Sequence, residues 1–360
     1  MSENFKKKLT VAVLYGGRSS EHEVSVHSAA EVCRLLSKKY KVIKILITKE
    51  DGLWHLQKEC GGLSSSDITV SPLISKKGNI MFESGKILKA DFFFPVLHGA
   101  MGEDGTMQGL FEILGAPYGG CGVLSSALGM DKELTKILAS RLNIPIVPYI
   151  KVFAQKKISA EVYARAAALG YPLFVKPLSL GSSIGASKVK EEKNLARALS
   201  FAFKYEDAAL VERAVENPRE VFCAVLGGGA GGKIEVSSCA ELKVLNSEFF
   251  DYKAKYEDPH GCDIITPAPL PLAVERAIKE DSAKIFGELR GRGFARVDFF
   301  VSREGQYYFS EINTIPGMSL TSLFPQMWKA DGKKYAAVLE RIVELGLKRK
   351  KERDKFSLNR

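Results

Sequence analysis

The sequence predicts an α/β fold, and three observations lead to this prediction. Short apolar segments alternate with amphipathic ones through the first third of the chain, which is the βαβ pattern of a parallel sheet with helices on its faces. A second series of strands and helices follows in the middle, and the last third combines long strands with two helices. With 360 residues, 46% of them hydrophobic, the chain is long enough for two or three domains with hydrophobic cores.

The first domain is expected to span residues 1–125 as a doubly wound parallel sheet. Its predicted helix, residues 25–36, has apolar side chains on one side, namely Val26, Ala29, Ala30, Cys33 and Leu36. The predicted strands are residues 9–14, 41–48 and 90–97. Polar, glycine-containing segments follow the first and last of these strands, and ligands of such sheets bind at the C-terminal ends of strands. We therefore expect one part of a binding site at each segment.

The second domain is expected to span residues 126–214. Asp131 is a suitable N-cap for a helix that runs to about Leu142. After two prolines the pattern predicts a strand, a helix, two strands, a second helix and a last strand. Residues 211–215 resemble a hinge into the third domain.

The third domain is expected to span residues 215–350, followed by a basic tail at 351–360. The predicted elements are strands at 220–227 and 233–245, a polar loop at 250–266, a helix at 272–290, a hairpin and a terminal helix at 333–347. The net charge is +10, but residues 348–360 hold seven basic and two acidic residues, which is half of the excess. A frayed, solvated end explains this charge, and no interleaving of aromatic and basic residues supports a nucleic-acid partner.

Composition also excludes several classes of protein. No apolar run approaches the roughly 20 residues that span a membrane. The basic residues 6–8 and the apolar run 9–15 superficially resemble a signal peptide, but the run is too short and lacks an Ala-x-Ala-like site. Six scattered cysteines without a Cys-x-x-Cys pair indicate neither zinc nor a disulfide framework, so we expect a reducing cytosol.

The most informative segment is a predicted hairpin around the polar turn 302–305. Asp298 lies at the start of its first strand, and Glu311 and Asn313 lie at the end of its second. Antiparallel pairing brings two carboxylates and an amide oxygen together, which suits Mg²⁺ bound with substrate phosphates. Arg296 beside them is suited to a phosphoryl group or a developing oxyanion. The alternative is a surface hairpin with solvated charges.

Two other segments are suited to binding phosphates. Lys176 ends an apolar strand and precedes a Gly/Ser loop at 181–185, whose backbone N–H groups and hydroxyls can close over phosphates. A plain β-turn is the alternative. Lys255 and Tyr256 follow an aromatic segment, which is either a lid that excludes water or a half-buried strand end.

Two glycine-rich segments argue against other nucleotide sites. Residues 227–233 mimic a Walker A loop, but Ile234 follows in place of Ser or Thr, so we expect a flexible hairpin loop. Residues 16–21 follow a strand but lack Gly-x-Gly-x-x-Gly, which weakens a dehydrogenase interpretation. Glu21 is either a charge that caps a helix or a partner for a substrate ammonium group.

Taken in order, these segments closely resemble the D-alanine–D-alanine ligase family of the ATP-grasp superfamily. The resemblance covers roughly residues 11–325 and rests on an ordered set of motifs. These are Gly16-Gly-Arg-Ser-Ser-Glu-His-Glu-Val-Ser25, His98-Gly-x-x-Gly-Glu-Asp-Gly-x-x-Gln-Gly109, Met130-Asp-Lys132, Lys176-Pro with Gly181-Ser-Ser-x-Gly185, Asp251-Tyr-x-Ala-Lys-Tyr256, Arg296-Val-Asp298 and Glu311-x-Asn-Thr-x-Pro-Gly-Met318. The family implies three domains: the parallel-sheet domain, followed by two ATP-grasp domains that grip ATP between them.

The resemblance also implies a role for each motif residue. ATP is expected at eight residues. Adenine is expected at Glu212 and Val215 and ribose at Glu220, and the other five residues are Lys132, Lys176, Ser182, Ser183 and Lys255. Two Mg²⁺ or Mn²⁺ ions are expected at Asp298, Glu311 and Asn313. The first D-alanine is expected at Glu21 and His98, and the second at Lys255, Ser322 and Leu323. Arg296 and Gly317 are expected to stabilise an oxyanion, and Glu21, Ser182 and Tyr256 to form a triad that ties the lid to the other domains.

The implied chemistry is activation of a carboxylate, which is a poor acyl donor, as an acyl phosphate that a second alanine's amine attacks. The implied product is D-alanyl-D-alanine for peptidoglycan, made in a bacterial cytoplasm by a homodimer. The nearest alternative is a D-alanine–D-lactate or D-alanine–D-serine ligase, or another ATP-grasp carboxylate–amine ligase. Tyr256 matches the dipeptide-forming pattern. A non-catalytic ATP-binding module is a further alternative, which the complete set of metal and phosphate residues disfavours.

Overall fold

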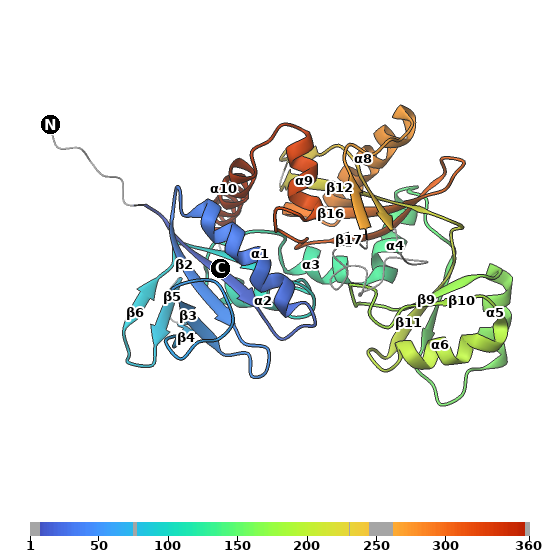
Figure 1. Ribbon diagram of the computed structural model, residues 1–360, viewed down its shortest axis with the longest axis horizontal. Helices are drawn as coiled ribbons and strands as arrows, with labels where there is room; N and C mark the ends of the chain where they lie inside the picture. The colour runs from blue at the N-terminus through green and yellow to red at the C-terminus, as the bar shows by residue number, and fades with distance from the viewer. Residues whose placement is uncertain (1–7, 75–77, 230, 245–261, 357–360) are drawn as a thin grey trace.

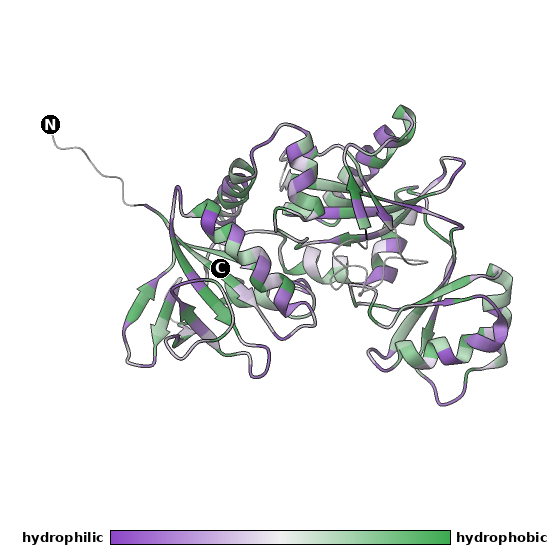
Figure 2. Ribbon diagram, viewed as in Figure 1, coloured by the Kyte–Doolittle hydropathy of each residue, from purple (hydrophilic) through white to green (hydrophobic). Residues whose placement is uncertain are grey.

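The computed structural model describes residues 8–74, 78–229, 231–244 and 262–356 (Figure 1). These residues form three sheets and the helices that cover them. Figure 1 shows the N-terminal and central domains at opposite ends of the molecule, with the C-terminal sheet between them. Figure 2 shows hydrophobic residues along the strands and a mixture of polar and apolar residues along the helices. This mixture is expected for helices that pack one face against a sheet and expose the other to water.

The N-terminal sheet is mixed. Strand β1 pairs in parallel with β2 and β7, which is the predicted parallel core, and the other pairs are antiparallel. The antiparallel strands β3 to β6 extend this core on the β2 side, and the sequence patterns had not indicated them because they are short and partly exposed. The order is β6-β5-β4-β3-β2-β1-β7. The bounds are β1 Thr10–Gly16, β2 Lys41–Ile47, β3 Trp54–Gln57, β4 Ile68–Pro72, β5 Asn79–Phe82, β6 Ile87–Lys89 and β7 Phe92–Val96.

Helix α1 (His22–Leu36) begins three residues before the predicted start and packs on this sheet. Its buried residues Ala29, Val32 and Cys33 follow the helical period, as predicted. The remaining helices of this part are α2 (Thr106–Ile113), α3 (Val123–Met130) and α4 (Lys132–Arg141). Asp131 caps α4 as predicted, because its carboxylate accepts a hydrogen bond from Leu134 N.

The central domain has the predicted order of strands and helices. Its antiparallel sheet β10-β9-β11-β8 is covered by α5 and α6. Because strand residues alternate between faces, Leu173 and Val175 are buried in this core while Phe174 and Lys176 face the other way. The bounds are β8 Tyr149–Phe153, α5 Ala160–Leu169, β9 Leu173–Pro177, β10 Ser187–Val189, the 3₁₀ turn η1 Glu192–Asn194, α6 Leu195–Ala202 and β11 Ala208–Arg213.

The C-terminal sheet has the order β15-β14-β12-β16-β17, with β13 paired to β12. The strand predicted at 233–245 is wrong: it is divided into β13 and β14, because Ser237 between them turns its hydroxyl to the backbone N–H of Ala224. The glycine-rich segment at its start joins β12 to β13 as a hairpin, as predicted. The bounds are β12 Arg219–Gly228, β13 Ile234–Val236, β14 Ala240–Val244, β15 Cys262–Ile265, α8 Leu272–Glu288, β16 Arg292–Val301, β17 Tyr307–Asn313, α9 Leu323–Ala330 and α10 Tyr335–Arg353.

The terminal helix α10 joins the first and third domains. Its apolar side belongs to one hydrophobic core with residues of β1, α1, β7, β12 and α9. At Gly346 the helix comes so close to the N-terminal domain that a Cβ atom would lie 2.2 Å from Tyr118 O. Arg349 donates hydrogen bonds to Gly120 O and Tyr118 O, at 2.6 and 2.8 Å. The prediction of a frayed end from residue 348 is therefore wrong as far as Arg353, because these carbonyl groups hold the helix in place.

No helix within the described ranges combines the length and the apolar character that a bilayer-spanning segment needs.

Candidate active site

A cavity of about 870 Å³ lies where the three domains meet. Each domain contributes to its wall, through the start of α1, the segment after β7, the loop after β9 and the strands β12, β16 and β17. Every predicted site residue within the described ranges lines it: Glu21, His98, Lys132, Lys176, Ser182, Ser183, Glu212, Val215, Glu220, Arg296, Asp298, Glu311, Asn313, Gly317, Ser322 and Leu323. The predicted residues Lys255 and Tyr256 lie outside the described residues.

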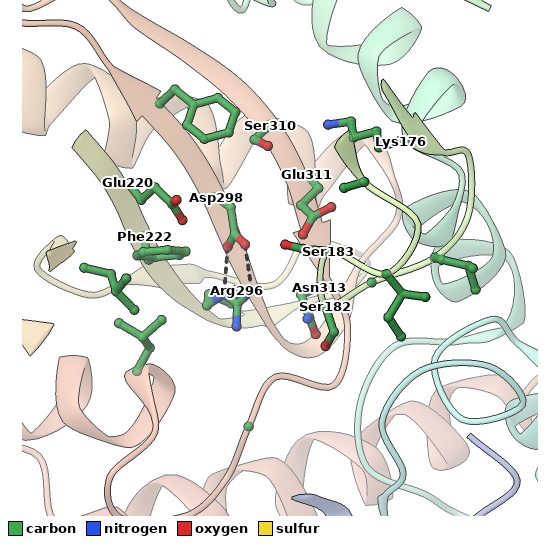
Figure 3. Close-up of a pocket in the computed structure, with 18 of the residues that line it drawn as sticks. Lys176, Ser182, Ser183, Glu220, Phe222, Arg296, Asp298, Ser310, Glu311 and Asn313 are labelled. Carbon is green, nitrogen blue, oxygen red and sulfur yellow. Dashed lines mark hydrogen bonds and ion pairs between the residues drawn. The ribbon is translucent and has the colours of Figure 1, made fainter. Parts of the chain in front are cut away.

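The β16–β17 hairpin carries a charged cluster into this cavity (Figure 3). Asp298 lies opposite Glu311 in the register, and Arg296 lies opposite Asn313. The expectation that Asp298 starts its strand is wrong: β16 begins at Arg292, because its first residues pair with the end of β12. The Arg296 guanidinium holds the Asp298 carboxylate through two hydrogen bonds of 2.7 and 2.6 Å.

The predicted metal residues fit a magnesium site. Figure 3 shows Asp298, Glu311 and Asn313 close together on the paired strands. Asn313 Oδ1 is buried and has no hydrogen-bond partner within the described part of the chain, so an acceptor oxygen is available there. The described residues contain no group of three or more His, Cys, Asp or Glu side chains that suits a metal. Mg²⁺ commonly binds one or two carboxylates and completes its shell with water and phosphate oxygens, so the two carboxylates and one amide are compatible with it.

Two lysines of α4 lie near the carboxylates of this region, and one of them, Lys132, lines the cavity. Lys132 lies 3.2 Å from Glu311 Oε2 and donates to Leu180 O at 2.6 Å. Lys136, one helical turn later, is 1% exposed and lies 3.0 Å from Glu212 Oε1. The sequence analysis had missed Lys136, although its spacing of four residues from Lys132 places both on one helix face.

Glu212 is held between two lysines. Its other carboxylate oxygen lies 2.9 Å from Lys176 Nζ. Burial opposes ionisation of Glu212, but Lys136 and Lys176 outweigh it and lower the pKa of this carboxyl to about 2. Burial in turn lowers the pKa of Lys136. The cluster therefore keeps a fixed negative charge between two cations, beside the strand end where adenine is expected.

A second buried carboxyl group lies at the opposite end of the cavity. Glu103 is 8% exposed, and its Oε1 lies 3.9 Å from Nδ1 of His98. Burial raises the pKa of Glu103 to about 7, and the charge of Glu21 adds to this effect. Burial opposes protonation of His98, but the Glu103 carboxyl outweighs it, so the pKa of His98 is raised. The sequence analysis named His98 but missed Glu103, whose position five residues later in the same motif was the available signal.

Glu21 connects the N-terminal domain to the central one. It occupies the N-cap position of α1, where its charge favours the helix dipole as the capping alternative expects, but its side chain makes no capping hydrogen bond. Its Oε1 instead accepts a hydrogen bond of 2.5 Å from the Ser182 hydroxyl. Ser182 and Ser183 both have positive φ, 53° and 57°, which curls the Gly/Ser loop toward the cavity. Two members of the expected triad are therefore in contact, and the third, Tyr256, lies outside the described residues.

The segment after β17 brings backbone donors to the cavity. A Cβ atom on Gly317 would lie 2.8 Å from the Ser322 hydroxyl, so a larger residue there must move the Ser322 side chain. Ser322 precedes α9, and its hydroxyl lies 2.8 Å from that of Ser319. The first N–H groups of a helix have no partner within it and favour anions, so this end of α9 is suited to a carboxylate.

Comparison with protein families supports the same interpretation. Residues 10–121 match the family model described as "D-ala D-ala ligase N-terminus". Residues 138–344 match the model described as "D-ala D-ala ligase C-terminus". Together the two models account for nearly all of the cavity wall.

Individual relatives agree over almost the full chain. The D-alanine--D-alanine ligase of Thermoanaerobacter sp. (strain X514) is 40% identical over 96% of this chain and 99% of its own length. The solved ligase from Coxiella burnetii has a TM-score of 0.85 and 33% identity, over 97% of each chain. The VanG D-Ala:D-Ser ligase from Enterococcus faecalis has a TM-score of 0.83 and 36% identity, over 94% of this chain and 100% of that one. All three relatives are ligases, which argues against the dehydrogenase alternative. We conclude that the chain belongs to the D-alanine–D-alanine ligase family.

Proposed function

We propose that this protein joins two D-alanine molecules through an acyl phosphate, with ATP converted to ADP and phosphate. The chain belongs to a family of ATP-dependent ligases that make the D-alanyl-D-alanine of peptidoglycan precursors. The observation that carries the proposal is a single cavity with two chemically different ends. One end holds lysines and the carboxylate hairpin, which suit phosphates. The other holds Glu21 and His98, which suit an amino acid.

We assign the nucleotide to the first end. Lys132, Lys176, Ser182, Ser183 and the lid residue Lys255 are proposed to contact its phosphates. Adenine is assigned to Glu212 and Val215, where β11 ends, and ribose to Glu220 on β12. The support is that all these residues except Lys255, which lies outside the described residues, line one cavity.

Two Mg²⁺ or Mn²⁺ ions are proposed at Asp298, Glu311 and Asn313. When bound there, they would neutralise phosphate charge next to the transferred group. The support is the buried Asn313 Oδ1 and the opposed positions of Asp298 and Glu311 on the hairpin.

The reaction then follows from the residues at the second end. The Glu21 carboxylate holds the ammonium group of the first D-alanine. The carboxylate of that D-alanine lies near His98. Attack of that carboxylate on the γ-phosphorus of ATP gives an acyl phosphate and releases ADP. The amine of the second D-alanine attacks the acyl carbon, and phosphate leaves from the tetrahedral intermediate. Arg296 and the Gly317 N–H stabilise the oxyanion, an effect that typically contributes a hundredfold or more.

The second D-alanine is placed by its carboxylate. Ser322 and the N–H of Leu323, at the start of α9, are proposed to receive it together with Lys255. Tyr256 would close the triad with Glu21 and Ser182 and exclude water, since water hydrolyses an acyl phosphate. The contact between Glu21 and Ser182 supports this assignment.

A second candidate is a D-alanine–D-serine or D-alanine–D-lactate ligase. The similarity to the Enterococcus faecalis D-Ala:D-Ser ligase favours keeping it as an alternative. Tyr256 matches the dipeptide-forming pattern of the family, and for that reason we favour D-alanine as the second substrate.

The decisive experiment measures phosphate release from ATP with Mg²⁺ and D-alanine, with L-alanine as the control. D-serine and D-lactate are offered as competing second substrates, and the products are identified by mass. We expect release that depends on D-alanine, with D-alanyl-D-alanine as the main product. A mixed or D-serine-containing product would overturn the specificity, and no D-alanine-dependent release would overturn the function. The proposal also includes a homodimer in the bacterial cytoplasm, which light scattering of the purified protein and fractionation of the source cells would test.

A further inference from the structure

Two cysteines that the proposed reaction does not use are in contact outside the active site. Cys33 lies on α1 and Cys60 lies in the segment after β3, and their Sγ atoms are 3.3 Å apart. They are 27 positions apart in the chain, so only the fold brings them together. A disulfide bond is about 2.05 Å long, which leaves little more than 1 Å for the two sulfurs to close.

The two thiols differ in access. Cys33 is 3% exposed and belongs to the core between α1 and the N-terminal sheet. Cys60 is half-buried, and its neighbours Lys58 and Glu59 are exposed. A reagent in solution therefore meets Cys60 first, and Cys33 is reached only from Cys60.

The surroundings of Cys60 favour its reactive, deprotonated form. Lys44 on β2 donates hydrogen bonds to Lys58 O and to Glu59, which places an ammonium group beside this segment. The hydrogen bond between Cys60 and Cys33 lowers the pKa of the Cys60 thiol against the opposing effect of burial, and Tyr15 and Lys44 lower it further. The thiolate is the nucleophile in disulfide chemistry, so the accessible member of the pair is also the more reactive one.

The chain contains an internal comparison. Cys223 and Cys239 have their Sγ atoms 3.1 Å apart, as close as the first pair. Both are fully buried, and burial raises the pKa of Cys223 well above its ordinary value, as the contact with Cys60 and burial do for Cys33. Proximity is therefore common to both pairs, and access exists in only one.

We propose that Cys33 and Cys60 form a reversible dithiol–disulfide site that reacts with small-molecule disulfides, with Cys60 attacking first and Cys33 resolving. The Cys60 thiolate attacks one sulfur of the small disulfide, whose S–S bond breaks and releases one thiolate. The Cys33 sulfur then attacks Cys60 Sγ, its proton passes to the medium, and the second small thiolate leaves. Two cysteine thiols are oxidised by two electrons in total, and one small disulfide is reduced to two thiols. The proposal does not depend on the proposed ligase function.

The test uses oxidised glutathione on the folded, full-length protein. All samples carry Cys262→Ser, because Cys262 is the other half-buried thiol. After quenching with acid, free thiols are alkylated in denaturant and counted by mass, and disulfide-linked peptides are mapped without reduction. We expect loss of two of the five remaining thiols, one linked peptide pair containing Cys33 and Cys60, and full recovery with a thiol reductant.

Variants separate the two roles. Cys33→Ala is expected to stop at a persistent glutathione adduct on Cys60, with one thiol lost; Cys33→Ser serves the same purpose if the alanine variant does not fold. Cys60→Ser is expected to lose no thiol. Cys223→Ser is the matched control from the buried pair, and it is expected to form the Cys33–Cys60 bond as before. Equal thiol loss in Cys60→Ser, a bond mapped to Cys223 and Cys239, or a Cys60 adduct that persists although Cys33 is present would each overturn the proposal.

Discussion

Two buried glutamates at opposite ends of one cavity have pKa values that are displaced in opposite directions. Glu212 is 3% exposed and Glu103 is 8% exposed, so both carboxyl groups have lost most of their water. The pKa of Glu212 is nevertheless lowered to about 2, and that of Glu103 is raised to about 7. The difference lies in their neighbours: two lysines contact Glu212, whereas Glu103 faces a histidine and shares its surroundings with Glu21.

The comparison shows that burial alone does not set the charge of a site. Loss of water disfavours the ionised form of both carboxyl groups, and only cations close by can reverse that preference. Glu212, at the end assigned to the nucleotide, therefore stays ionised at any moderate pH. The end assigned to D-alanine contains Glu103, whose pKa is raised to about 7. The following experiments break or sharpen this distinction, beginning with the largest expected effect.

Glu311→Gln removes a carboxylate from the end assigned to the nucleotide. We expect ligase activity to fall about a thousandfold, because a carboxylate that faces Lys132 and the proposed metal position is lost. The thermal midpoint should change little, since Glu311 is partly exposed and glutamine keeps its shape. The measurement is D-alanine-dependent phosphate release, together with a melting curve.

Glu304→Gln is the matched control for that change. Glu304 lies on the exposed turn between β16 and β17, in the same hairpin but away from the cavity. The ligase activity of the Glu304→Gln variant is expected to equal that of the unmodified protein. Retention of activity in Glu311→Gln would contradict the assignment of this hairpin to phosphate and metal.

Lys136→Met tests whether two lysines are needed to keep Glu212 ionised. Removing one partner of a buried ion pair typically costs roughly 3 kcal/mol of stability or more, because the other charge stays buried. We expect this loss in urea unfolding and a rise in KM for ATP of about tenfold, with a smaller change in kcat. Lys151→Met is the control, since Lys151 pairs with Glu133 at a more exposed position where a loss below about 1 kcal/mol is expected. Equal effects of the two substitutions would show that Lys136 has no special role.

Stability should depend on pH in opposite directions at the two ends. The pKa of Glu103 is raised from an ordinary 4.5 to about 7, so the unfolded chain loses this proton at lower pH than the folded protein does. The free energy of unfolding therefore falls as pH rises between these two values, by on the order of 3 kcal/mol. The raised pKa of His98 acts in the same direction, because its contribution is lost as pH rises through that value. Glu212 contributes stability above pH 4.5 that is lost only as pH falls toward 2.

Urea unfolding at pH 5, 6, 7 and 8 measures this dependence. The unmodified protein should lose stability from pH 5 to 7, and Glu103→Gln should lose less, because glutamine does not titrate. Identical pH profiles for the two proteins would mean that Glu103 is ionised in the folded state at neutral pH. That result would remove the contrast between the two glutamates.

The smallest expected effect concerns the start of α4, which carries Lys132 at the cavity wall and Lys136 beside Glu212. Asp131→Ala removes the cap that accepts from Leu134 N and should cost about 1 kcal/mol. Ser159→Ala removes the corresponding cap of α5, which accepts from Val162 N. We expect similar losses of stability in both variants, but a raised KM for ATP only in Asp131→Ala. A raised KM in both would show that the effect is general loosening of the fold.

Much of the site was predictable because its residues lie in short motifs. The apolar runs on both sides of one polar turn predict the hairpin that carries Asp298 and Glu311. Their direct pairing, however, depends on a register shift between Asp298 and Phe299, which no local pattern shows. The Gly/Ser loop after Lys176 and the cap at Asp131 are equally local. The divided strands β13 and β14 were not predictable, because a serine that bonds to a neighbouring strand has the same pattern as one in a continuous strand.

The sequence by itself determined the family, the order of strands and helices in the central domain and the motif residues that face the cavity, because period, turn chemistry and motif spacing act over a few residues. Only the tertiary structure decided the charge of Glu103 and Glu212, the burial of Lys136, the anchoring of α10 through Arg349 and the contact between Cys33 and Cys60. Each of these depends on groups from elements far apart in the chain. Their distances, and the water they exclude, are properties of the packed molecule, and no local pattern carries them.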